Sequence, residues 1–458
     1  MNVIVIVSDT FRRDHLGAYG NSRIHTPHLD RFASESVVFD GHHVGSFPTM
    51  PARADLMTGR LSCAFMTWEP LPKELPTVAE AFKSAGYLTT AIVDTPFYIR
   101  NGFAYDRGFH DFFWIRGQGD GSRPEERADA RSTWVGESDR YVARTMTAAE
   151  NWLERHADEK FFLVVDTWDP HEPWNPPDYY TRRYLPDYEG GEVDPPYALW
   201  REAGLSECDL AVAHATYCGE VTMVDRWIGH LLEKIDLVGI REETIVLFLS
   251  DHGYYFGEHG YLGKSVWVPE AKTQTWSPLY GELTRIPLML RIPGVEPGRR
   301  RALTSLPDVA PTLLDLAGLE LEGATGKSFA GVALGQAADE HRPFVISSWP
   351  LGYQKGRISV AVDSSPRRVA QDLPLTITTP TRSVIVGGPD DPIEVYDLDA
   401  DAAEQTDISA REHESTASLV EVAISELRAE GATPELLAPR EGALESFRNG
   451  KHAASVEL

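Results

Sequence analysis

The sequence predicts an α/β fold: a large, mostly parallel sheet flanked by helices, followed by a smaller C-terminal α+β subdomain with an antiparallel sheet. Residues 161–166 and 244–250 are continuous apolar runs, as expected of central strands buried on both faces; the first ends at Asp166 and the second is followed by Asp251. A helical pattern separates them, which is typical of parallel strands joined by crossover helices. Beyond about residue 340 the apolar runs shorten and turn residues divide them, which indicates the second sheet.

The first three quarters of the chain alternate between strand and helix. Residues 3–7 predict the first strand. Thr77 and Glu80 have the spacing of a capping box, so a helix starts there, ends near Gly86 and leads to a strand at 87–93. Further along we expect a helix at 213–235, a strand at 286–292, and a helix that Asp308 caps and that runs to Gly318.

The C-terminal quarter predicts a small sheet packed against one helix. Its short strands lie at 344–347, 358–362, 375–378, 382–386 and 393–396, and its helix at about 416–429. The residues after about 439 are polar and predict a frayed end. We therefore expect a main domain at 1–338, a subdomain at 339–440 and a polar tail at 441–458.

Composition limits the function. The 458 residues carry a formal net charge of −26, from 69 acidic and 43 basic side chains. No basic surplus exists to neutralise a phosphate backbone, so nucleic acid is excluded as a general partner. The three cysteines, Cys63, Cys208 and Cys218, lack CxxC spacing and predict reduced structural thiols, neither disulfides nor a zinc knuckle. Neither a signal peptide nor a membrane span is recognisable, so we expect a cytoplasmic protein without a membrane partner, and a homo-oligomer stays open.

Polar residues follow two of the predicted strands, at the edge where open α/β sheets bind ligands. Asp9 follows the first strand, and Asp251 and His252 follow the strand at 244–250. Two carboxylates, an imidazole and the hydroxyl of Thr49 make a plausible divalent-metal site. We expect one divalent ion. Mixed oxygen and nitrogen ligands favour Mn²⁺ or Zn²⁺, with Ca²⁺ as a further option.

Residues 49–60, TMPARADLMTGR, predict a short helix whose start faces an anion. Thr49 suits the N-cap, Pro51 the first turn, and Gly59 the end of the helix. A helix start offers free backbone N–H groups and a partial positive charge. The hydroxyl of Thr49 and the guanidinium of Arg53 are therefore expected where an oxyanion binds.

This segment closely resembles the signature of sulfatases, in which Cys or Ser, a variable residue, Pro, Ser or Ala, and Arg precede Leu-Thr-Gly-Arg. Met57 replaces the Leu, and Thr49 stands where sulfatases carry the Cys or Ser that is oxidised to formylglycine. Other branches of the same alkaline-phosphatase-like superfamily use Thr directly as a metal-bound nucleophile on phosphorus. The resemblance implies the alkaline-phosphatase-like fold and, with Thr at this position, an enzyme that acts on phosphoryl groups.

The same resemblance supports the metal site. Asp9 matches the first metal-binding Asp of sulfatase-like enzymes, and the Asp251–His252 dipeptide matches the pair that the later strand supplies. It also implies a position for Thr49 on the metal. In this family the metal polarises the substrate, so the implied cofactor is again one divalent ion.

Two further residues gain roles from the resemblance. Residues 251–264, DHGYYFGEHGYLGK, closely follow the version in phosphonate monoester hydrolases and choline-sulfatase-like members, which ends in an active-site Lys. Lys264 is thus expected to bind a nonbridging oxygen or to assist the leaving group. His171, in the loop DPHEPW at 169–174, corresponds to a His that lies over the ester oxygen and is expected to act as general acid or oxyanion-binding group.

One segment departs from the sulfatase pattern. Many sulfatases follow the strand equivalent to 87–93 with Gly-Lys-Trp-His, which supplies a Lys and a His that bind sulfate. Here residues 94–98 read DTPFY. Without these two side chains we expect weaker binding of a doubly anionic sulfate group. Asp94 and Thr95 are expected to meet a neutral or cationic part of a diester substrate.

These residues together predict a metal-dependent hydrolase of small anionic phosphoric or phosphonic esters, of the phosphodiesterase or phosphonate monoesterase type, with Thr49 as nucleophile. Three alternatives remain. The chain could be a sulfatase with an unconventional nucleophile, or a transferase that passes a phospho-group to an alcohol. It could also be an inactive binding protein on a sulfatase-like scaffold.

Overall fold

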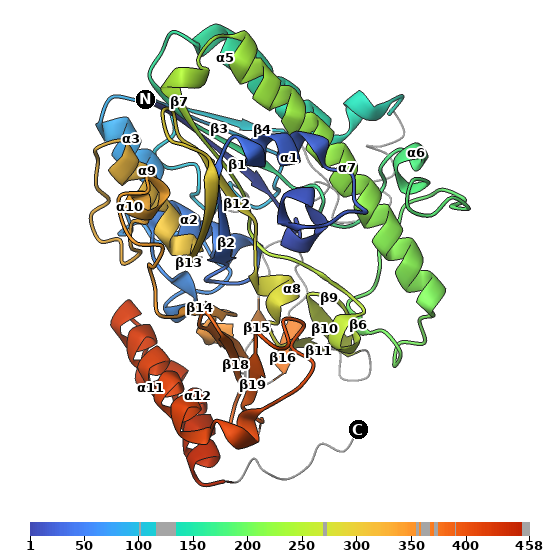
Figure 1. Ribbon diagram of the computed structural model, residues 1–458, viewed down its shortest axis with the longest axis vertical. Coiled ribbons are helices and arrows are strands. Elements are labelled where there is room, and N and C mark those ends of the chain that lie inside the picture. Colours follow the sequence, from blue (N-terminus) through green and yellow to red (C-terminus); the bar gives the residue numbers. More distant parts are fainter. Residues whose placement is uncertain are drawn as a thin grey trace.

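Figure 1 shows the computed structural model, which describes residues 1–99, 102–115, 134–268, 273–353, 357–358, 367–370, 374–389 and 391–450. Its centre is an eight-stranded sheet in the order β13-β2-β12-β7-β1-β5-β3-β4. The strands are β1 (Asn2–Ser8), β2 (Val37–His43), β3 (Leu88–Val93), β4 (Asp111–Trp114), β5 (Phe161–Thr167), β7 (Thr244–Ser250), β12 (Leu288–Arg291) and β13 (Gly298–Ser305). The predicted α/β class is confirmed.

The sheet is mixed, although its central part is parallel. β7, β1, β5, β3 and β4 all pair in parallel, and β12 runs antiparallel to both β7 and β2. The strand predicted at 286–292 thus exists as β12, but it reverses direction relative to its neighbours. Its side chains are still buried, as in the parallel strands.

Helices cover both faces of the sheet (Figure 1). Along β1, Val3, Val5 and Val7 belong to one core, and Ile4 and Ile6 belong to the other, because side chains alternate across a strand. The first core contains α2 (Thr49–Thr58), α3 (Val78–Ser84), α9 (Val309–Leu316) and α10 (Ala330–Ala333); the second contains α1 (Pro27–Ser34), α5 (Tyr141–His156) and α7 (Glu207–Leu237). Burial on both faces explains the continuous apolar runs of the central strands.

The start of one helix agrees with the sequence, and the starts of two others differ. Thr77 and Glu80 form the predicted capping box at α3. The helix predicted at 213–235 is longer, because Ser206 and Asp209 form a capping box that starts α7 earlier. Asp308 precedes α9 but makes no side-chain cap there. Its carboxylate instead binds the guanidinium of Arg342, so the predicted capping role of Asp308 is wrong.

The C-terminal part contains a four-stranded antiparallel sheet, β14-β17-β18-β19, beside two helices (Figure 1). The elements are β14 (Val345–Ser348), β17 (Leu375–Thr378), β18 (Arg382–Val386), β19 (Glu394–Asp397), α11 (His413–Glu430) and α12 (Pro434–Arg448). The strand predicted at 358–362 falls mostly outside the described residues; 357–358 form β15 (Arg357–Ile358).

The polar tail predicted from residue 441 starts too early, because α12 continues to Arg448. Leu437, Leu444 and Phe447 lie on one buried face of this helix and join the core of the small sheet. Their spacing of seven and three residues is an amphipathic helical pattern that the polar composition hides. The prediction of one helix in this subdomain is therefore wrong, since α11 and α12 pack there together.

The remaining short elements connect these layers. They are β6 (Ala198–Leu199), β8 (Tyr255–Phe256), β9 (Tyr261–Gly263), β10 (Ser265–Val268), β11 (Thr273–Trp276), β16 (Arg367–Ala370), α6 (Asp178–Thr181) and α8 (Gly281–Thr284). Across the described residues no helix has both the length and the apolar character needed to cross a membrane.

Candidate metal and ester-binding site

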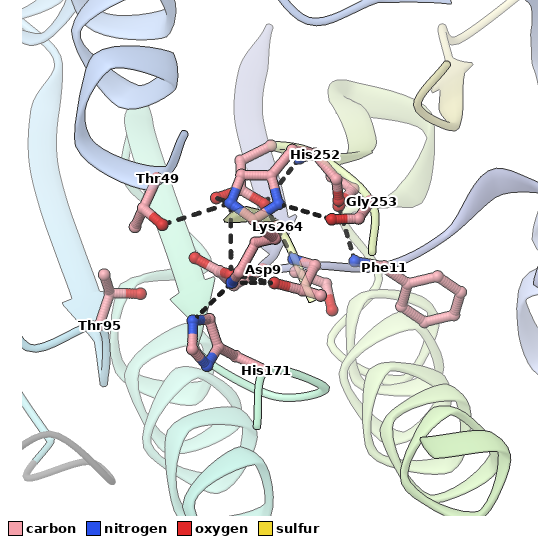
Figure 2. Close-up of polar contacts among 12 residues, drawn as sticks. Asp9, Phe11, Thr49, Thr95, His171, His252, Gly253 and Lys264 are labelled. Carbon is pink, nitrogen blue, oxygen red and sulfur yellow. Dashed lines mark hydrogen bonds and ion pairs between the residues drawn. The ribbon is translucent and has the colours of Figure 1, made fainter. Parts of the chain in front are cut away.

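The predicted site residues gather where parallel strands end. Asp9 directly follows β1, the Asp251–His252 pair follows β7, and Asp94 follows β3. Because β7, β1, β5 and β3 are parallel neighbours, their carboxyl ends meet at one edge of the sheet. Thr49 opens α2 at the same edge. Figure 2 shows the side chains of Asp9, Thr49, His171, His252 and Lys264 directed toward one another.

Asp9, Asp251 and His252 form a buried cluster of metal-ligating groups. One ligand atom from each lies within 4.8 Å of the others. The Nδ1–H of His252 donates to the carbonyl of Gly253 at 3.0 Å, which leaves the lone pair on Nε2, the atom that faces the carboxylates. Burial and the neighbouring Asp251 carboxylate raise the pKa of Asp9 well above its ordinary value. Two buried carboxylates and a correctly oriented imidazole are a donor set that fits a divalent cation.

Thr10 fixes the two carboxylates. Its backbone N–H donates to Oδ1 of Asp251 at 2.9 Å, and its hydroxyl donates to Oδ1 of Asp9 at 2.6 Å. The residue has a φ of 59°, in the left-handed region that non-glycine residues rarely adopt. This turn lets one residue bind both carboxylates of the cluster.

Thr49 is the first residue of α2, and Pro48 occupies the N-cap position without a side-chain cap. The predicted N-cap role of Thr49 is therefore displaced by one residue. Freed from capping, its buried hydroxyl lies 3.3 Å from Nε2 of His252, at the edge of the carboxylate cluster (Figure 2). Gly59 ends the helix in the left-handed conformation with a φ of 64°, as predicted.

Arg53 lies one turn further along α2 and is fully engaged by carboxylates. Its Nη1 lies 2.9 Å from Asp9 and 2.6 Å from Asp251, while Nε and Nη2 bind Asp166 at 2.9 and 2.8 Å. We expected Arg53 to face an oxyanion at the helix start. The guanidinium instead binds both carboxylates of the Asp9–Asp251–His252 cluster and holds them in place.

Asp166, the acidic residue near the end of β5, was not among the predicted site residues. Besides Arg53 it accepts hydrogen bonds from Tyr98 at 2.5 Å and from Thr95 at 2.6 Å. The sequence carried one signal for it, since the apolar run at 161–166 ends at this Asp. The hydroxyl of Thr95 is therefore directed at Asp166, and its predicted contact with substrate remains a prediction.

Asp94 is directed into the scaffold. Its fully buried carboxyl group accepts hydrogen bonds from the hydroxyls of Thr145 at 2.6 Å and Thr167 at 3.0 Å and from the backbone N–H of Trp168. Burial and the nearby Asp169 raise its pKa to about 8. This arrangement ties β3 to α5 and β5, and it favours a structural role over the predicted substrate contact.

His171 and Lys264 approach from the opposite side of the cluster. Nζ of Lys264 donates to Nε2 of His171 at 2.8 Å, and the Nδ1–H of His171 donates to the carbonyl of Glu172 at 2.6 Å. Burial and the Lys264 ammonium lower the pKa of His171 well below its ordinary value. His171 is thus a neutral acceptor, so the ammonium of Lys264 is the proton donor of this pair. Lys264 also contacts the hydroxyl of Thr10 at 3.3 Å.

Two residues near Lys264 were missed by the sequence reasoning. Oε1 of Glu172 lies 3.6 Å from Nζ of Lys264 and accepts a hydrogen bond from Tyr197. Tyr197 lies in a long connection with no motif of its own, so no sequence signal could have found it. Glu172 thus pairs with the ammonium of Lys264, and Tyr197 holds the carboxylate of Glu172.

The comparisons with known proteins agree with this geometry. The sequence profile of the sulfatase family matches residues 1–319. The chain belongs to the sulfatase family. The assignment confirms the predicted family and, with it, the general class of ester hydrolase. Enzymes of this superfamily use a divalent metal ion, which the cluster of Asp9, Asp251 and His252 fits.

Individual relatives of this sulfatase-family chain differ in the esters that their names record. An ulvan-active sulfatase from Formosa agariphila is 30% identical over 356 residues, which cover 72% of this chain and 64% of that protein. The crystal structure of the phosphonate monoester hydrolase of Agrobacterium radiobacter aligns with a TM-score of 0.72 at 21% sequence identity. The alignment covers 94% of this chain and 95% of the hydrolase. A phosphonate monoester hydrolase from Silicibacter pomeroyi aligns with a TM-score of 0.73 at 20% sequence identity. That alignment covers 95% of this chain and 96% of the hydrolase. The two structures confirm the alkaline-phosphatase-like fold.

Proposed function

We propose that this chain is a metal-dependent hydrolase of phosphoric or phosphonic esters in which Thr49 is the nucleophile. The observation that carries the proposal is the position of an ordinary threonine hydroxyl, 3.3 Å from His252, at the start of α2 and beside the buried acids. A sulfatase mechanism needs an aldehyde hydrate at this position, and the maturation of Cys or Ser supplies it. An unmodified secondary alcohol instead suits direct attack on phosphorus.

Asp9, Asp251 and His252 would hold the divalent ion, and Thr49 is the proposed fourth protein ligand. Such an ion supplies Lewis-acid chemistry, which lowers the pKa of a nearby hydroxyl and polarises a phosphoryl oxygen. Arg53 keeps the two carboxylates in their positions. Mn²⁺ or Zn²⁺ suits this mixed donor set, and Ca²⁺ remains an option.

The reaction would proceed in two displacements. Oγ1 of Thr49 gives its proton to solvent and forms a bond to phosphorus, while the bond from phosphorus to the ester oxygen breaks. The ammonium of Lys264 gives its proton to the departing alkoxide, and His171 holds that ammonium through its Nε2. Water then attacks phosphorus and gives one of its protons to Lys264. The bond from Oγ1 of Thr49 to phosphorus breaks, and Oγ1 takes a proton from solvent as the phosphate or phosphonate leaves.

The charges of the site favour a substrate with a single negative charge. The guanidinium of Arg53 is already paired with three carboxylates. Within the described part of the site, the ammonium of Lys264 is the side-chain cation left to meet the substrate beside the proposed divalent ion. A phosphodiester or a phosphonate monoester carries one negative charge at neutral pH, whereas a phosphate monoester carries nearly two. We therefore propose the former as substrates.

Sulfate esters are the second candidate, because the ulvan-active relative is named a sulfatase. A panel of nitrophenyl esters distinguishes the two: a phosphate monoester, a bis-nitrophenyl phosphate, a phenylphosphonate and a sulfate. The chain is first stripped with a chelator and then loaded with Mn²⁺, Zn²⁺ or Ca²⁺. We expect the highest kcat/KM for the diester or the phosphonate, and no turnover before loading. The proposal is wrong if the sulfate ester is the preferred substrate.

Replacing Lys264 with Ala is expected to lower kcat/KM by about 10²–10⁴-fold for alkyl esters, since the leaving alkoxide then departs without a proton donor. The loss should be smaller for nitrophenyl esters, because nitrophenolate leaves readily without protonation. Activity is measured across a series of leaving groups. Lys234→Ala is the matched control, because Lys234 lies on α7 away from the site and pairs there with Glu154 of α5. Equal losses for good and poor leaving groups would contradict the assigned role.

A further inference from the structure

A second group of metal-ligating side chains lies apart from the Asp9–Asp251–His252 cluster. His15, His214 and Cys218 each offer one ligand atom, and these three atoms lie within 4.8 Å of one another. His15 belongs to the short 3₁₀ helix at Arg13–His15, which follows β1. His214 and Cys218 lie four residues apart on α7, so one face of the helix presents both side chains. We propose that these three residues form a zinc site, called here the His₂Cys site.

The distances agree with tetrahedral coordination. Ligand bonds of about 2.0–2.1 Å to nitrogen and 2.3 Å to sulfur place tetrahedral nitrogen and sulfur ligands about 3.6 Å apart, and two nitrogen ligands about 3.3 Å apart. Sγ of Cys218 lies 3.6 Å from Nε2 of His214. Nε2 of His15 lies 2.9 Å from Nε2 of His214. Of these two contacts, a bound ion would widen the second by a few tenths of an ångström and leave the first unchanged.

The orientation of His15 is that of a metal ligand. Its Nδ1–H donates to Oδ1 of Asp14 at 2.8 Å, which places the lone pair on Nε2, facing His214. A carboxylate that holds the remote nitrogen of a ligating imidazole is the usual second partner in zinc sites. Without an ion, Nε2 of His214 must carry the proton of the short contact between the two rings. On binding, that proton moves to Nδ1 of His214.

Charge around the three ligands suits a divalent ion. Asp14 and Glu258 both bind the guanidinium of Arg12, so two carboxylates face one cation. The Cys218 thiol loses its proton to solvent when it binds the ion, which adds a second net negative charge. Burial raises the pKa of this thiol to about 12, but a coordinating metal deprotonates a thiol outright. A dication therefore balances the local charge.

The exposure of the three ligands and the residues around them also agree with a zinc site. His15 and Cys218 are buried, while His214 is exposed, so an ion has a path from solvent and a fourth position for water. The rings of Tyr217 and Phe256 pack against His15 and exclude water from the other side. Two imidazoles and one thiolate with an open position are a donor set for Zn²⁺, because hard ions such as Mg²⁺ and Ca²⁺ avoid sulfur.

Zinc bound here would brace the segment that carries Asp9. Tyr217, the residue before Cys218, donates its hydroxyl to the carbonyl of Thr10 at 2.8 Å and accepts the N–H of Arg12 at 2.8 Å. The site would therefore join the chain just after β1 to α7 by metal bonds beside these hydrogen bonds. Its role is structural, so it does not depend on which ester the protein cleaves.

Cobalt distinguishes this site from the other cluster, because only a site with a cysteine gives a thiolate-to-Co²⁺ charge-transfer band. The full chain is stripped with a chelator and titrated with Co²⁺, and zinc per chain is counted separately by atomic emission. We expect the wild type to show the thiolate band and two bound zinc ions. Asp251→Asn, which alters the other cluster, should keep the band.

Variants on α7 decide the assignment. Cys218→Ser should lose the band and one zinc ion, and the Tm gained on zinc addition should fall. His214→Asn, at an exposed side chain that leaves the core intact, should weaken Co²⁺ binding at this site by about 10–100-fold. Cys208→Ser and His230→Asn, on the same helix, are the matched controls and should behave like the wild type. A wild type without the band, or a band that persists in Cys218→Ser, would overturn the proposal.

Discussion

Replacing Thr49 with Ala is expected to abolish turnover, by at least about a thousandfold in kcat, because the variant lacks the proposed covalent nucleophile. The fold should survive. The Thr49 side chain makes one long contact, 3.3 Å to Nε2 of His252, and loss of such a bond costs about 0.5–1.5 kcal/mol. Steady-state kinetics on the preferred ester and a urea unfolding curve measure the two effects.

Two further variants sharpen this prediction. Thr49→Ser keeps the hydroxyl and should keep measurable activity, whereas Thr49→Val keeps the shape without the hydroxyl and should be as inactive as the Ala variant. The mass of the residue 49 peptide shows that the Ser variant is unmodified. Activity of Thr49→Ala above about a tenth of normal would point to another nucleophile. Ser46 is poorly placed for that role, since its hydroxyl donates to Asp55 at 2.8 Å.

Replacing Arg53 with Met should lower the free energy of unfolding by about 3–5 kcal/mol, because it leaves buried carboxylates without their shared cation. Arg53, Asp9 and Asp166 have no exposed side-chain surface, and Asp251 has almost none. The same change removes the group that positions Asp9 and Asp251. Metal affinity should therefore fall by about 10–100-fold, and activity should fall with it. Urea unfolding and metal titration test the two effects separately.

Arg60→Met is the control for Arg53→Met. Arg60 follows the end of α2, is partly exposed, and lies 4.0 Å from the carboxylate of Glu430. A pair of this kind contributes at most about 1 kcal/mol. If the Arg53 and Arg60 variants lost equal stability, the carboxylates around Arg53 would not depend on its charge, and the positioning role would be wrong.

The fold and the clustering of Asp9, Asp251 and His252 could be predicted because they depend on local patterns. Continuous apolar runs mark strands buried on both faces, and an acid directly after such a run lies at the ligand-binding edge of the sheet. Asp9 and Asp251 follow this rule, and His252 is the residue after Asp251. α12 was missed because Leu437, Leu444 and Phe447 are separated by polar residues, so composition suggested a tail while the spacing indicated a helix.

The partners of the site residues could not be predicted, because they depend on strand register and loop packing. Arg53 binds Asp166 across 113 residues of sequence, and His171 meets Lys264 across 93 residues. The sequence therefore predicted correctly that Arg53 lies at the site. It predicted a contact with an oxyanion, whereas the structure shows contacts with three carboxylates. His15 lies 199 residues before His214, so the proposed His₂Cys site has no recognisable spacing as a whole.

The direct test of the account is to trap the covalent intermediate. The metal-loaded chain is mixed with a nitrophenyl phenylphosphonate, quenched in acid during turnover, digested and examined by mass spectrometry. The account predicts a phosphonyl group on the peptide that contains Thr49, absent from the Thr49→Ala variant. Turnover with an unlabelled Thr49, or with the label on another residue, would contradict it.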